Sequence, residues 1–181
     1  ASTASQPTIG SDAALQLALY QDKNPISVHG GGYGSSTNVW GNVTDNFGAA
    51  DQVDTPHCDY PMLYGDLYGG SALGKINTKD NGASSATTYT RVNVLNGSVK
   101  WKTKEVNNIT YQYGGSIYGG GLGEKNGVNG GTSNIAALVY GEIHVNIGAE
   151  KTAESGPFGQ ASLIGCNVYG CNNINGSPQH D

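Results

Sequence analysis

The chain has 181 residues, enough for one domain with its own core, and nothing in the sequence indicates a second domain. Charged residues make up only 13% of it, 29 residues are glycine, and the net charge is −5. With nine Lys and Arg residues and no basic run, the chain lacks the positive surface that binds a phosphate backbone, so no nucleic-acid partner is expected. No stretch approaches the roughly 18 apolar residues of a membrane helix, so no membrane insertion is expected.

The composition favours an all-β fold. A surface of Asn, Ser, Thr, Gln and Gly suits strands joined by tight turns, because Asn and Gly tolerate the positive φ angles that such turns require. The chain starts at Ala1 rather than at Met, which fits a mature exported form as well as a trimmed one. We therefore expect an extracellular or cell-surface protein.

The first 27 residues lack the pattern that follows and are expected to form an N-terminal cap segment. Within them, residues 11–21 favour a helix capped by Ser11, although Leu15, Leu17 and Leu19 also alternate as in a strand. Either element would cover the open end of a stack of strands, which otherwise invites association.

From residue 28 onward, two motifs recur at intervals of about fifty residues. The first reads YGDLYGGSALG and then YGGSIYGGGLG, with shorter copies VHGGGYG and IGCNVYG; these are residues 64–74, 113–123, 28–34 and 164–170. The second is a short alternating segment at residues 43–48, 92–97 and 143–148. Two motifs with one spacing predict a parallel β-helix or solenoid over residues 28–181, built from about four units. An antiparallel β-sandwich with repeated hairpins is the alternative.

Equivalent residues of the units should stack into inward-facing columns. One predicted column is Val28, Leu67, Ile117 and Val168, and another is Val43, Val92 and Ile143. With two coils in each unit, seven or eight coils would give a body roughly 35 Å long at the ~4.8 Å spacing of neighbouring strands. The segments between the motifs are expected to be variable loops; they are residues 49–63, 77–89, 100–112, 124–135 and 149–160.

A row of rings follows the first inward column. His29, Tyr68, Tyr118 and Tyr169 each come directly after an inward residue, so strand alternation places them on the opposite face. Such a row either stacks on itself to stiffen the coil, which we favour, or binds sugar rings. The glycine pair after the first three of these rings would permit a sharp corner or a close approach of neighbouring backbone.

The three cysteines are Cys58, Cys166 and Cys171, too few for a fold held together by disulfides. Cys166 and Cys171 are close enough in sequence to form a disulfide across a bend. The alternative is that both are small buried side chains.

Sites for chemistry are scarce. The segment from Asp51 to Pro61 groups three carboxylates with His57 and Cys58, but it matches no recognised ligand spacing, so neither a metal nor a cofactor is expected. Solenoid enzymes that cleave polysaccharides need paired carboxylates or a basic residue on an outward strand. Arg91 is the one arginine, and the acids of the recurring strands do not share a repeat position. We expect no catalytic residues and no enzymatic activity.

The glycine-rich copies, and above all Val168-Tyr-Gly-Cys-Asn-Asn-Ile-Asn-Gly-Ser-Pro178, resemble the repeats of large glycine-rich surface proteins of Bacteroidetes-type bacteria. This resemblance implies an exported, β-rich surface or fibrous protein, and it carries over no catalytic residues. We therefore predict a structural protein that associates with itself into a surface or fibrous assembly. The alternatives are a surface adhesin that binds glycans through the row of rings and, behind it, a carbohydrate-active enzyme.

Overall fold

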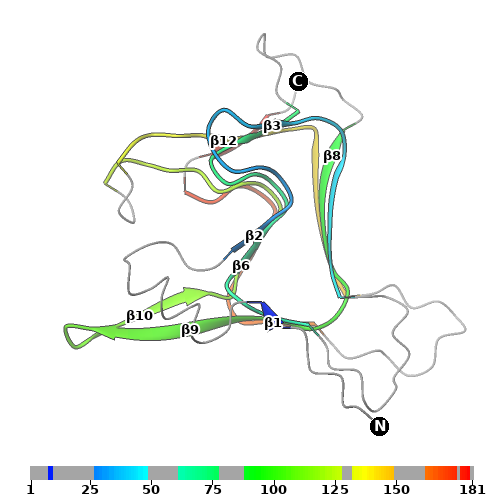
Figure 1. Ribbon diagram of the computed structural model, residues 1–181. Coiled ribbons are helices and arrows are strands. Elements are labelled where there is room, and N and C mark those ends of the chain that lie inside the picture. The colour runs from blue at the N-terminus through cyan, green and yellow to red at the C-terminus, as the bar shows by residue number, and fades with distance from the viewer. Residues whose placement is uncertain are drawn as a thin grey trace, which may run out of the picture.

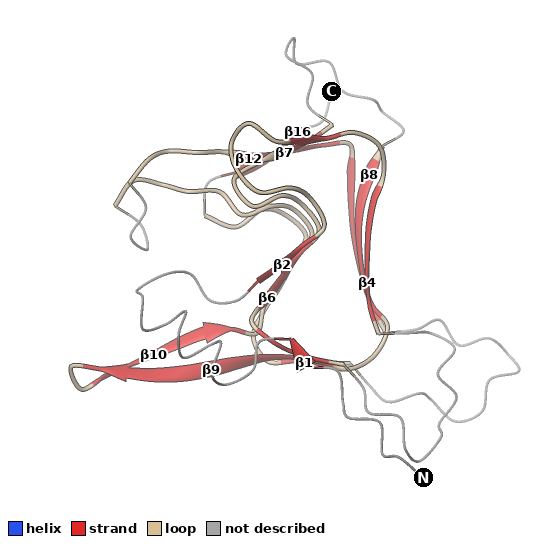
Figure 2. Ribbon diagram, viewed as in Figure 1, coloured by secondary structure: helices blue, strands red, loops and turns tan. Residues whose placement is uncertain are grey.

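The computed structural model describes residues 8–9, 27–48, 61–77, 88–127, 132–148, 162–174 and 176–179. These residues form an all-β solenoid of four sheets, and no helix is drawn among them (Figure 2). In the described part of the chain there is accordingly no helical segment that could cross a membrane. The predicted solenoid is confirmed, and its parallel pairing rules out the antiparallel sandwich.

Each sheet is named here by a central strand. The β6 sheet contains β2 (Ser27–His29), β6 (Asp66–Tyr68), β11 (Ile117–Tyr118) and β15 (Val168–Tyr169). The β7 sheet contains β3 (Asn38–Val39), β7 (Lys75–Ile76), β12 (Ala137–Tyr140) and β16 (Gly176–Gln179). The β8 sheet contains β4 (Val43–Phe47), β8 (Tyr89–Val94) and β13 (Glu142–Ile147). The β9 sheet contains β1 (Thr8–Ile9), β5 (Met62–Tyr64), β9 (Ser98–Val106), β10 (Ile109–Gly114) and β14 (Leu163–Ile164).

The chain passes through one strand of each sheet before it returns to the first, so each unit of about fifty residues makes one coil. Figure 1 looks along the stack, where strands of successive coils overlap. The expectation of two coils per unit is therefore wrong, because the strands of one unit are divided among four different sheets. The β6 sheet has four strands, so its outer strands lie only about 14 Å apart at the usual spacing of 4.7–4.9 Å.

Strand register confirms the first predicted column and corrects the second. Val28 pairs with Leu67, Leu67 with Ile117, and Ile117 with Val168. In the β8 sheet, however, Val43 and Ile143 both pair with Thr90, and Val92 pairs with Asp45 and Val145. The middle strand is thus displaced by two residues from the predicted alignment. A shift of two keeps the same face inward, so the motif pattern alone could not reveal it.

The core lies between the walls of the coil. One buried cluster joins the β6, β8 and β9 sheets and consists of Phe47, Leu63, Leu67, Val92, Val94, Val99 and Ile117. A second cluster joins the β7 and β8 sheets and consists of Val43, Ile76 and Val139. Because no single coil encloses these side chains, the core exists only in the stack.

Glycine follows each ring of the β6 sheet, and after the first three rings neighbouring atoms leave no room for a side chain. A Cβ atom on Gly69 would lie 2.5 Å from the carbonyl oxygen of Gly119 and 2.7 Å from Cγ2 of Val92. At Gly119 it would meet the side chains of Ile143 and Val145. This confirms the predicted close approach of neighbouring backbone.

Two expected segments differ in the structure. Residues 100–112 belong to a hairpin of β9 and β10 that projects from the body (Figure 1), with Ile109 paired to Val106 and Gly114 to Trp101, so the predicted loop is wrong. Strand β5 likewise occupies the end of the predicted loop 49–63. Near the N-terminus, Thr8 and Ile9 pair with β5 as part of the coil, whereas the helix or strand expected at residues 11–21 lies outside the described residues.

Candidate functional site

The four predicted rings form a continuous ladder through the coils. His29 stacks on Tyr68 with ring centroids 4.6 Å apart, Tyr68 on Tyr118 at 4.7 Å, and Tyr118 on Tyr169 at 4.9 Å. The interplanar angles are 9°, 7° and 11°. The parallel register of the β6 sheet causes this arrangement, because it places each ring one strand spacing from the next.

A polar column runs beside the ladder on the same face of the sheet. The hydroxyl of Ser27 lies 2.7 Å from Nε2 of His29, and the carboxylate of Asp66 accepts a hydrogen bond of 2.9 Å from the backbone N–H of Ser116. Burial raises the pKa of Asp66, and the Ser116 N–H partly opposes this effect. Burial also raises the pKa of Tyr118 to about 12, with a smaller contribution from the charge of Asp66. Both tyrosines of the inner coils therefore stay neutral at physiological pH.

The stacked geometry bears on the two interpretations of the ladder. A sugar ring binds against the face of an aromatic ring, but both faces of Tyr68 and of Tyr118 are covered by neighbouring rings. Tyr68 is 2% exposed, and its hydroxyl accepts a hydrogen bond of 2.9 Å from the Asn173 amide. The inner part of the ladder is thus a structural stack.

The inward columns are more exposed at the last coil than at the first. Val168 and Ile147 continue the inward columns, yet they are 47% and 44% exposed. At the other end of the same columns, Phe47 is 7% exposed and Val28 is partly buried against the core. The C-terminal end of the described coils therefore presents core-type side chains to solvent.

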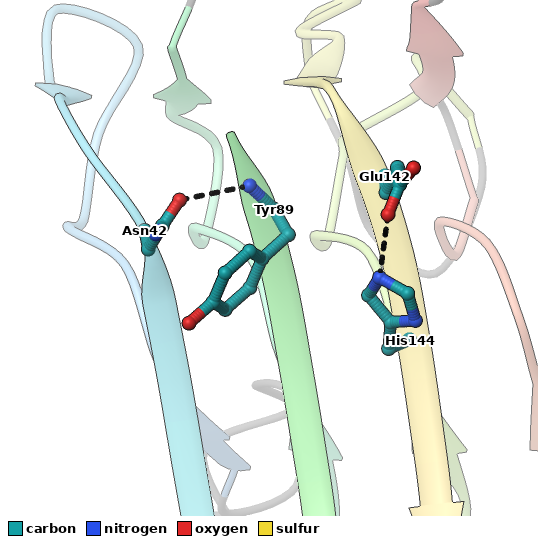
Figure 3. Close-up of polar contacts among 4 residues, drawn as sticks. All are labelled: Asn42, Tyr89, Glu142 and His144. Atoms are coloured by element: carbon teal, nitrogen blue, oxygen red, sulfur yellow. Dashed lines mark hydrogen bonds and ion pairs between the residues drawn. The ribbon is translucent and has the colours of Figure 1, made fainter. Parts of the chain in front are cut away.

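The outward face of the β8 sheet carries a polar cluster. The guanidinium of Arg91 lies 4.3 Å from the ring centroid of Tyr89, and this ring meets His144 edge-on at 6.1 Å. Figure 3 shows Nε2 of His144 in an ion pair with Glu142 at 2.9 Å, and the Asn42 side chain accepting a hydrogen bond of 3.1 Å from the Tyr89 N–H. These side chains come from three successive coils.

Amide side chains form a second ladder on this face. Asn146 donates a hydrogen bond of 2.8 Å to Asn93, and Asn93 donates one of 2.8 Å to Asn46. The register of the β8 sheet also aligns Thr44, Arg91 and His144 in a row directly beside this ladder.

Sequence reasoning missed this row because of the displaced alignment. Pairing Val92 with Ile143 sets Arg91 against Glu142, whereas the structure sets it against His144. Both residues 89–93 and residues 142–146 show period-two alternation in the sequence. Aligning their polar positions, rather than their apolar positions, would have placed Arg91 beside His144.

The possible Cys166–Cys171 disulfide is not formed, because both thiols are free, and the alternative of two buried side chains does not hold either, since Cys171 is exposed. The extended strand β15 lies between them: the Cys166 N–H bonds the carbonyl of Gly115, whereas the carbonyl of Cys171 accepts a bond from Gly120. Cys58 and His57 lie outside the described residues. In the part of the chain that the structure describes, no group of three or more His, Cys, Asp or Glu side chains is placed to hold a metal ion.

These features define a β-solenoid with one structural ring ladder, one open end and one polar outward face. No family model, curated protein or solved structure matches the chain.

Proposed function

We propose that the chain is an extracellular or surface structural protein that pairs with a second copy of itself through its last coil. The observation that carries this proposal is the contrast in exposure between the ends: Val168 and Ile147 are half exposed, whereas their counterparts Val28 and Phe47 are partly buried and buried, respectively. Exposed apolar side chains favour association, because burying them removes apolar surface from water.

The backbone of the last coil supports the same proposal. The strands β13, β15 and β16 stand at the end of their sheets in the described chain. An edge strand offers unpaired N–H and C=O groups to another strand. Two last coils related by a twofold axis would run antiparallel to each other, and antiparallel pairing satisfies these groups.

Charge does not oppose contact between two identical faces. Among residues 132–148, 162–174 and 176–179, the Asp, Glu, Lys, Arg and His side chains are Glu142 and His144, and these two contact each other on the outer face. The exposed outer face of the Tyr169 ring, which is 40% exposed, could stack on its equivalent.

A closed pair fits the structure better than an endless head-to-tail stack. Head-to-tail stacking would need the first coil to be as open as the last, but its inward residue Phe47 is 7% exposed and Val28 is partly buried against the core. An isologous contact uses one surface on both copies, which is the commonest symmetry among oligomers.

Light scattering coupled to size-exclusion chromatography tests the pairing. We expect the wild-type chain to approach twice its mass of 18.7 kDa as its concentration rises. Val168→Lys and Ile147→Lys should each keep it at 18.7 kDa, since each places a charge in the contact. Tyr33→Lys is the matched control, because Tyr33 is 79% exposed on the first coil and its change should leave the pair intact. A wild-type mass of one chain at every concentration would refute the proposal.

A further inference from the structure

We propose that the outward face of the β8 sheet binds an acidic polysaccharide, with Arg91 holding a carboxylate of the sugar. This site is separate from the last-coil contact, so the two proposals can fail independently. The face consists of the row Thr44, Arg91 and His144, the amide ladder beside it, and Tyr89 with Glu142 on the other side.

The first step is the state of Arg91, the one arginine of the chain. Its guanidinium lies over the Tyr89 ring at 4.3 Å, which fixes the orientation of the planar group. Within the described residues it has no carboxylate partner, because the Glu142 carboxylate is engaged by His144. A fixed guanidinium with free N–H groups matches the two oxygens of a carboxylate.

The second step is the alignment of the neighbours. Thr44 and His144 pair with Arg91 from the two adjoining strands, so three polar side chains lie in line about 4.8 Å apart. The Thr44 hydroxyl is exposed, and Glu142 holds His144 through Nε2, which leaves Nδ1 free for a ligand. An extended ligand that lies along the solenoid axis would meet all three.

The third step is the amide ladder, which supplies groups for hydroxyls. Each of Asn93 and Asn146 uses one amide N–H within the ladder and keeps a second one. Asn46 accepts from Asn93, so its own amide N–H groups are not used in the ladder. A row of oriented amide donors beside a guanidinium suits a ligand that carries hydroxyls next to a carboxylate, as a uronic acid does.

Other anionic polymers fit this face less well. A nucleic acid strand needs several cations to neutralise its phosphates, and this face has one arginine on a chain of net charge −5. An acidic peptide would need apolar anchors, and the outward residues of the three strands are polar apart from the Tyr89 ring that Arg91 covers.

Isothermal titration with polygalacturonate fragments tests the site. Arg91→Gln should weaken binding about tenfold or more, since hydrogen bonds to a charged group are lost. Arg91→Lys should fall in between, because it keeps the charge without the planar pair of donors. Lys102→Gln is the matched control, because Lys102 also lies over a tyrosine ring, that of Tyr64 in the β9 sheet. This variant loses one positive charge away from the proposed site, and it should bind the fragments as the wild type does.

Outcomes of three kinds overturn the proposal. Binding that Arg91→Gln leaves unchanged would remove the arginine from the site. Equal binding of a neutral polymer such as dextran would exclude carboxylate recognition. Equal or tighter binding of polyglutamate or single-stranded DNA would exclude the saccharide. Circular dichroism spectra that coincide for all variants would show that each is folded.

Discussion

The Tyr68 ring lies on the Tyr118 ring with the centroids 4.7 Å apart and the planes 7° from parallel. These two residues are fifty positions apart in the sequence, and the parallel register of β6 and β11 brings them into contact. The contact repeats on either side, with His29 below and Tyr169 above, so four coils are joined by one column of rings. Such a column resists sliding of one coil over the next.

Removal of an inner ring should destabilise the stack strongly. Tyr68→Ala deletes a side chain that is 2% exposed and stacked on both faces, so we expect a loss of about 3–5 kcal/mol in the free energy of unfolding. Tyr68→Phe keeps the stack and loses the hydrogen bond with Asn173, which should cost about 1 kcal/mol. Urea unfolding followed by circular dichroism measures both. A loss from Tyr68→Ala no larger than that from the exposed-ring variant Tyr33→Ala would contradict the structural role of the ladder.

The glycines after the rings should differ according to the space around them. Gly69→Ala places a Cβ atom 2.5 Å from the Gly119 carbonyl oxygen, so we expect a loss of about 1–3 kcal/mol. Gly170→Ala is the control on the last coil, because nothing lies within 4 Å of its Cβ position. Thermal unfolding of both variants measures the difference. Equal effects would mean that the backbone of the next coil does not approach Gly69 as closely as described.

Asp45 should make stability depend on pH. Its carboxyl faces the core in the column of Val92 and Val145. The Oδ2 atom is buried without a hydrogen bond, and burial raises the pKa of Asp45 to about 6. The folded chain therefore holds this proton more tightly than the unfolded chain, whose carboxyl titrates near 3.8. This group then lowers stability progressively as the pH rises from about 4 through about 6.

Asp45→Val should remove that penalty and extend the apolar column. We expect a gain of about 1–2 kcal/mol at pH 7, less than a fully buried carboxyl would give because this one is partly solvated. The gain should shrink toward pH 4, where the native carboxyl is protonated. Urea midpoints at a series of pH values measure it, and a gain that is the same at pH 4 and pH 7 would show that the charge is not its cause.

His29 should make stability depend on pH in the direction opposite to that of Asp45. Burial lowers its pKa from 6.5 to about 4, so the unfolded chain binds this proton more readily, and stability is lost as the pH falls from about 6.5 to about 4. Between pH 4 and 6 this loss offsets part of the gain from Asp45. His29→Tyr supplies the ring that the other three coils have and cannot become cationic, so its stability should not fall over that range. An acid-induced loss equal to that of the wild type would assign the effect to another group.

The repeat of the ring motif was sufficient to predict the solenoid, the column of Val28, Leu67, Ile117 and Val168, and the ring ladder. This prediction succeeded because the motif recurs at the same place in every coil. Its strands there pair in one register with the equivalent strands of the neighbouring coils. The number of coils was not predictable in this way, because short two-residue strands such as β7 and β14 leave little periodicity in the sequence.

Two further features escaped prediction for physical reasons. The β9–β10 hairpin is exposed and polar over much of its length, so its strands lack the apolar alternation that marks a buried strand. The polar row of Thr44, Arg91 and His144 depends on register, which is set by the stacking of coils rather than by the motif. Both errors arise because contacts between coils, and not local sequence, decide these positions.

Pairing through the last coil is tested most directly by electron microscopy of the wild-type chain at several concentrations. We predict discrete two-body particles that meet at their C-terminal ends, with the exposed side chains of Val168 and Ile147 inside the contact. Continuous filaments would show that the first coil also associates, and single bodies at every concentration would show that the open face has no second copy on it. Either of these results would contradict the pairing proposed here.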